Sequence, residues 1–107
     1  HRKFICDEID KGWDGKIVVV SHHPPHEECA RNKFHQADDP LAPCYFNRDL
    51  EEWIEKADYW LHGHIHNWSH VKIGKCQIIA KPRGYIGHQT CAYEYDLMNR
   101  DAEIIEL

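Results

Sequence analysis

The run Ile17–Val20 constrains the fold more than any other feature of the sequence. Its four consecutive β-branched residues are apolar on both faces of an extended strand. Such a strand suits a position buried between two layers better than one with a face in solvent. We therefore expect a layered fold, with Ile17–Val20 inside it. The run ends at Ser21, where a histidine-rich segment begins.

A helix and a second strand are expected further along the chain. Asn47 is a plausible N-cap, and the helix that it would start carries one apolar stripe, formed by Leu50, Trp53, Ile54 and Ala57. The apolar run Tyr59–Leu61 is read as the next strand. A helix of about three turns is long enough to cross between two parallel strands of one sheet. These residues predict a strand-helix-strand unit.

Antiparallel strands are predicted after this unit. Residues 71–73 and 76–80 flank Gly74-Lys75, a two-residue loop with glycine where a type II′ turn requires it. Further strands are expected at Cys91–Tyr95 and Ala102–Ile105. The fold class is therefore α/β, with one βαβ unit followed by antiparallel strands. The 107 residues are within the size of a single domain.

Between the first strand and the helix lies a long segment without sustained periodicity. It is polar and contains Pro24, Pro25, Pro40 and Pro43. Loops longer than about 12–15 residues inside a compact domain are usually binding loops or lids. We therefore interpret residues from about 24 to 46 as a lid-like loop.

Composition excludes several classes of function. A formal net charge of −5 does not indicate a nucleic-acid partner, and no apolar stretch approaches the ~18 residues that a membrane span needs. Five cysteines without a CxxC pair indicate neither a disulfide framework nor a zinc ribbon, so a reducing, cytoplasmic location is expected. Ten histidines are an unusually high number for this length.

Two histidine groups follow directly after the two predicted parallel strands, as Ser21–Pro25 and His62–His66. Ligands bind at the carboxyl ends of strands in open α/β sheets, because the loops converge there. If residues 62–66 are extended, His64 and His66 point to the same side. Neutral imidazole nitrogen is a common ligand for zinc, iron and similar cations. The placement predicts a metal site.

The order of these motifs resembles the later motifs of calcineurin-like metallophosphoesterases. The shared order is a strand, His-His-Pro, a loop, a helix and Gly-His-x-His. The segment Lys81–Tyr85 is similar to the Asn-Pro-Arg-Gly-Tyr segment of one bacterial branch, with lysine in place of asparagine. The resemblance spans roughly residues 16–88. It implies the C-terminal half of an αββα sandwich, so that residues 1–107 form a single, partial domain.

The resemblance also implies roles for individual residues. His22 and His64 would bind one metal ion and His66 the other, at a dinuclear site of manganese, iron or zinc. A metal-bound hydroxide would hydrolyse a small-molecule phosphate monoester or diester. His23 would contact the phosphate or support a ligand, and otherwise is a packed or solvent-facing residue. Arg83 could clamp a phosphate oxygen, with a structural role as the alternative.

The family's N-terminal ligand motifs are not found in this sequence. Two divalent ions at ~3.5–4 Å need bridging carboxylates, which neutral imidazoles do not replace. His1 in place of Met favours a chain that begins inside a longer protein, with the N-terminal half of the domain missing. The alternative is a catalytically incomplete metal-binding module that holds one ion or none. A weaker third hypothesis is a simple three-histidine zinc hydrolase.

Overall fold

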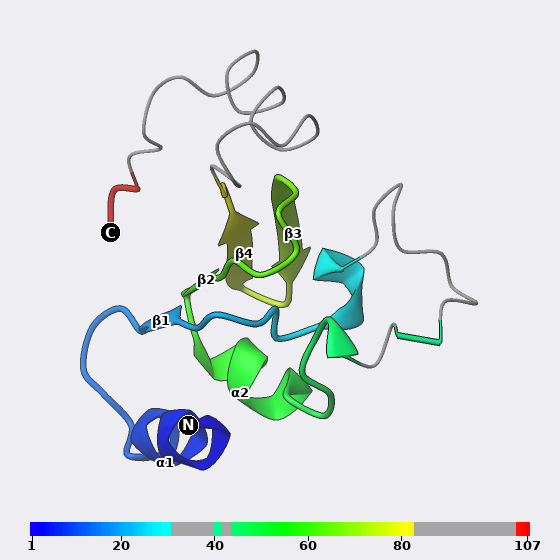
Figure 1. The fold of residues 1–107 in the computed structure, drawn as a ribbon. Helices are drawn as coiled ribbons and strands as arrows, with labels where there is room; N and C mark the ends of the chain where they lie inside the picture. Colours follow the sequence, from blue (N-terminus) through cyan, green and yellow to red (C-terminus); the bar gives the residue numbers. More distant parts are fainter. Residues whose placement is uncertain (31–39, 42–43, 83–104) are drawn as a thin grey trace.

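The computed structural model describes residues 1–30, 40–41, 44–82 and 105–107 (Figure 1). Within these ranges the chain is an α/β protein with a four-stranded mixed sheet. The elements in chain order are helix α1 (Arg2–Asp10), strand β1 (Val18–Val20), the 3-10 helix η1 (Glu27–Cys29), helix α2 (Glu51–Lys56), and strands β2 (Tyr59–Leu61), β3 (Ser69–Ile73) and β4 (Cys76–Ala80).

The sheet has the strand order β1-β2-β4-β3. Strand β1 pairs parallel with β2, and β2 pairs parallel with β4. Since α2 lies between β1 and β2 in the chain, the predicted βαβ unit is confirmed. The β3–β4 pair is antiparallel, as predicted, and Gly74 in its turn has φ +57°, which glycine adopts without strain.

Helix α2 begins later than predicted. Its N-cap is Leu50, which provides no side-chain hydrogen bond, so the prediction that Asn47 caps the helix is wrong. Asn47 instead donates its backbone N–H to the carbonyl of Pro24 at 2.8 Å. This bond ties the segment before α2 to the loop after β1. Acidic residues in the first turn and Lys56 in the last turn agree with the helix dipole.

The hydrophobic core lies on the face of the sheet that the helices cover. Val19, Trp60 and Ile78 are paired across β1, β2 and β4, and all three side chains are buried. Helix α1 packs against α2, and α2 packs against β4 (Figure 1). Helix α1 had not been predicted from the sequence, although Cys6 and Ile9 supply its buried side chains.

The opposite face of β1 is open in the described part of the chain. Val18 is 40% exposed and Val20 is 71% exposed, whereas Val19 is only 6% exposed. The expectation that both faces of this strand are buried is therefore met on one face only. Val20 starts an apolar row that continues through Leu61 on β2 to Ile79 on β4.

Asp58 holds the start of the parallel sheet together. Its carboxylate accepts the backbone N–H of Ile17 at 2.9 Å, and Lys16 and Lys75 lie at 3.5 and 3.4 Å. The backbone carbonyl of Asp58 accepts a hydrogen bond from the backbone N–H of Gln77 at 3.0 Å. The N–H of Ile17 and the two lysines hold the pKa of Asp58 below its usual value.

Some predictions concern residues outside the described ranges. Residues 91–95, most of 102–105, and Arg83 lie there, as does the middle of the 24–46 loop. The described start of this loop forms η1, whose N-cap is His26. In the described ranges, no helix is both long and apolar enough to cross a membrane.

Candidate functional site

The two histidine segments meet at one edge of the sheet. Ser21 and His22 follow β1, and the segment from His62 follows β2. Because β1 and β2 are adjacent and parallel, their carboxyl ends lie side by side. The topology therefore brings together two segments that are some 40 residues apart in the chain.

Three imidazole rings are in contact at this edge. The ring centroids of His23 and His64 are 4.1 Å apart, and those of His22 and His64 are 5.1 Å apart. His22 and His23 are 5.2 Å apart, with their rings perpendicular. We call His22, His23 and His64 the histidine cluster. It joins two of the three predicted metal ligands with the predicted phosphate-contacting residue.

Backbone hydrogen bonds fix the two segments against each other. The N–H of Ser21 donates to the carbonyl of Leu61 at 3.0 Å, which extends the β1–β2 pairing by one residue. The N–H of Gly63 then donates to the carbonyl of His22, also at 3.0 Å. The cluster is thus held by a continuation of the sheet and not by side chains alone.

The backbone of the second segment is not extended. His64 has φ +65° and His66 has φ +55°, both in the left-handed region, so the premise that placed their side chains on the same side is wrong. Non-glycine residues in this region carry a conformational cost of ~1–2 kcal/mol, and strain of this kind gathers at functional sites. Gly63, the glycine of this segment, does not have a left-handed φ, so the two histidines carry this conformation instead.

The environment of His64 favours the neutral ring. Burial lowers the pKa of His64, and the neighbouring rings of His23 and His22 lower it further. A hydrogen bond to the backbone of Cys44 opposes these effects, and His66 contributes a smaller lowering. Neutral imidazole is the form that binds a metal ion.

His62 lies inside the protein, but only one of its ring nitrogens has a hydrogen-bond partner in the described part of the chain. Only 8% of it is exposed. Its Nδ1 is 3.1 Å from the carbonyl of Gly63, and its Nε2 is buried without a partner in the described part of the chain. Burial lowers the pKa of His62, which favours the neutral ring here as well, although the hydrogen bond to Gly63 acts in the opposite direction.

Two further histidines have structural partners. The ring of His26 accepts the N–H of Glu28 at 3.2 Å and so caps η1. The Nε2 of His70 is 2.9 Å from the side-chain oxygen of Gln77 on the neighbouring strand. Neither residue belongs to the histidine cluster.

The donor chemistry of the cluster fits a zinc-like or iron-like cation, but the described donors do not complete a site. The three imidazole rings are nitrogen donors of the kind that such cations bind, and they follow the ends of two paired strands. Among residues 1–30, 40–41, 44–82 and 105–107, no group of three or more His, Cys, Asp or Glu side chains is arranged to hold a metal ion. A metal site here would need further ligands beyond the described residues.

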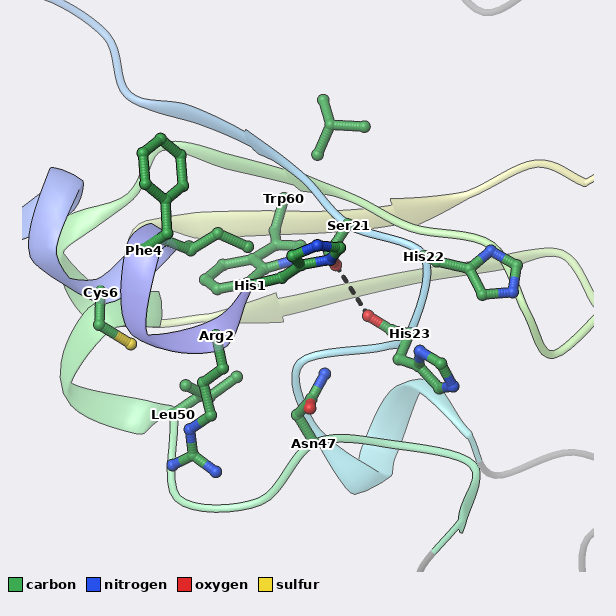
Figure 2. A pocket seen from close by; sticks show the side chains of 12 residues that line it. His1, Arg2, Phe4, Cys6, Ser21, His22, His23, Asn47, Leu50 and Trp60 are labelled. Atoms are coloured by element: carbon green, nitrogen blue, oxygen red, sulfur yellow. Dashed lines mark hydrogen bonds between the residues drawn. The ribbon is translucent and has the colours of Figure 1, made fainter.

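A cavity of about 660 Å³ lies beside the first histidine segment (Figure 2). Helix α1 contributes Phe4 and Ile5, the segment before α2 contributes Leu50, and Trp60 is buried beneath. Figure 2 shows His22 at one end of this space. The cavity could not be predicted from the sequence, because it depends on α1, for which the sequence has no pattern that indicates a helix.

No family model, no curated protein and no solved structure matches the chain.

Proposed function

We propose that this chain is the C-terminal part of a metal-dependent phosphoesterase of the calcineurin-like type, and that the histidine cluster supplies its imidazole ligands. The observation that carries the proposal is the contact of the His22, His23 and His64 rings at the carboxyl ends of β1 and β2. The ordered motifs and the βαβ unit that positions them support the same reading.

The residues of this chain would bind and orient the metal ions. His22 and His64 approach each other from separate strands, so together they fix one ligand pair. His66 follows two residues after His64 and is the ligand proposed for a second ion. Bound manganese, iron or zinc would polarise the phosphate and lower the pKa of water. His23 lies within the cluster, where it could contact the phosphate.

The open face of β1 supports a partner layer. In the complete αββα sandwich, a second sheet would lie against this face, where the row Val20, Leu61 and Ile79 ends in an exposed valine. That row is apolar, and its exposed end at Val20 would gain burial on assembly. The same layer would bring the carboxylates that the described residues lack. The N-terminal half of the domain is the partner that we propose.

Metal binding by the chain itself tests the ligand assignment. After chelator treatment, calorimetric titration with Zn²⁺ or Mn²⁺ should show binding that weakens in His22→Ala and His64→Ala. His70→Ala is the matched control, because His70 bonds Gln77 outside the cluster. Binding that is equal in all three variants and the unchanged chain would contradict the assignment.

The pH dependence of binding follows from the protonation of the ligands. A cation displaces protons from imidazole, so affinity should fall as the pH drops through the histidine range. The lowered pKa of His64 keeps that ring neutral to a lower pH than a free histidine. Affinity that is constant from pH 8 to below pH 5 would exclude imidazole ligands.

A second candidate is a metal-binding module without catalytic activity. The absence of the family's N-terminal aspartate and asparagine motifs from this sequence favours it. Hydrolysis of an aryl phosphate ester distinguishes the two candidates. If the chain is a metal-binding module, it binds metal but hydrolyses no ester, even after the N-terminal half of such a domain is added. Turnover on that addition would instead support the phosphoesterase.

A further inference from the structure

A buried tryptophan is hydrogen-bonded to the segment that carries the first two histidines. Trp60 is 1% exposed and lies in β2 beneath the core face. Its indole Nε1–H donates to the hydroxyl of Ser21 at 2.9 Å. A phenylalanine would fill most of the same core space without needing an acceptor, so the indole adds a specific polar contact.

The hydroxyl of Ser21 also forms a hydrogen bond with the backbone two residues further on. It donates to the backbone carbonyl of His23 at 2.8 Å, drawn as a dashed line in Figure 2. Ser21 also donates its backbone N–H to Leu61 at 3.0 Å. The hydroxyl and the backbone N–H of Ser21 are thus both bonded to β2. Through its bond to the His23 carbonyl, Ser21 fixes the backbone of His22 and His23.

This turn sets the direction of two rings of the cluster. The carbonyl of His23 cannot rotate without breaking the bond to Ser21, and the backbone of His22 is fixed by Gly63. The ring of His23 is 4.1 Å from that of His64, which belongs to the other segment. The orientation of the cluster therefore depends on a hydrogen-bond chain that begins in the hydrophobic core.

We propose that Ser21 and Trp60 are positioning residues for the histidine cluster, acting through the chain of hydrogen bonds from the Trp60 indole to the Ser21 hydroxyl and on to the His23 carbonyl. Neither residue belongs to the proposed metal ligands. They hold the three imidazole rings of the cluster in contact with one another. The metal-binding part of this inference rests on the proposed function, whereas the positioning of the rings does not.

The matched variants are Ser21→Thr and Ser21→Val, which have nearly the same shape and differ in the hydroxyl. Threonine keeps the acceptor and the donor, and valine removes both. Loss of groups that orient metal ligands typically costs 10–100-fold in affinity. We expect Zn²⁺ affinity to fall about 10–100-fold in Ser21→Val and to stay within about threefold in Ser21→Thr.

A measurement without metal separates positioning from metal binding. In the metal-free chain, proton NMR should show a cross-relaxation signal between the rings of His23 and His64, whose centroids are 4.1 Å apart. The signal should persist in Ser21→Thr and weaken in Ser21→Val and Trp60→Phe. Both changes break the same chain of hydrogen bonds. The ring signal should therefore weaken no more in the double variant than in Ser21→Val alone.

The outcomes are distinguishable. Loss of the ring signal in Ser21→Val with retention in Ser21→Thr supports the inference, even if the unchanged chain binds no Zn²⁺, a result that would count only against the proposed function. A folded Ser21→Val with the ring signal and any Zn²⁺ affinity unchanged would overturn it. If Ser21→Val does not fold, Trp60→Phe decides: an unchanged ring signal overturns the inference, and a weakened one supports it.

Discussion

The adjacent residues Val19 and Val20 test whether only one face of strand β1 is covered. They have identical side chains in the same strand, and alternation turns them to opposite faces. Val19 is 6% exposed and Val20 is 71% exposed. The perturbation is the same in both cases, a change to alanine, so any intrinsic loss of strand propensity largely cancels in the comparison.

The expected difference follows from the carbon atoms removed from the core. Valine to alanine removes two methyl-sized groups, each worth about 0.8 kcal/mol when fully buried. At Val19 nearly all of this is lost, and the resulting cavity raises the cost to about 1.5–3 kcal/mol. At Val20 less than a third of the side chain is buried, so the cost is about 0.5 kcal/mol.

Urea unfolding followed by far-ultraviolet circular dichroism measures both values. The two variants should have similar m-values, so that the shift in midpoint reports stability alone. A Val20→Ala variant that is destabilised as much as Val19→Ala would refute the reasoning, since it would mean that the second face is already covered in the isolated chain. If the proposed sandwich forms with its other half, we expect the cost at Val20 to rise toward that at Val19.

Four other groups of residues lead to measurable outcomes. The lowered pKa of Asp58 means that its charge stabilises the fold above the ordinary pKa of ~3.9 and that this contribution is lost as the pH falls through the lower folded value. In Asp58→Asn, the free energy of unfolding should therefore fall less steeply as the pH is lowered below about 4. The same steepness as in the unchanged chain would contradict this. Gly74→Ala should cost about 1 kcal/mol in thermal unfolding, because φ is +57° there, and a neutral result would argue against that turn. For the same reason, metal-free His64→Gly should be about 1 kcal/mol more stable than His64→Ala in urea, unless the left-handed conformation is absent. Cys44 is exposed, whereas burial raises the pKa of Cys29 to about 12. An alkylating reagent at pH 8 should therefore modify Cys44 first, as followed by mass spectrometry. Equal rates at the two cysteines would contradict the burial of Cys29.

The parts of the fold that depend on local pattern could be predicted from the sequence. The apolar runs before Ser21 and at 59–61 became paired parallel strands, and Gly74 marked the hairpin. The placement of the histidine groups at strand ends followed from these elements. Cluster formation then required only that β1 and β2 be neighbours.

The remaining features depend on contacts that no local pattern reports. The bond from Trp60 to Ser21 spans 39 residues, and the composition of neither segment signals it. The left-handed conformations of His64 and His66 reflect the path of the backbone after β2. Asn47 has the residue type of an N-cap, yet its backbone pairs with Pro24, because a tertiary contact outweighed a weak local preference.

Strand β1 forms the outer edge of the described sheet, and this position affects the handling of the isolated chain. In the described ranges it pairs with β2 alone, and Val18 and Val20 are exposed beside it. An apolar edge with unpaired backbone groups is a template for another strand, and natural proteins usually protect such edges with charge. In concentrated solution, self-association through β1 would therefore compete with any intended partner. Low protein concentration, or a lysine at position 18, is the physical means of limiting it.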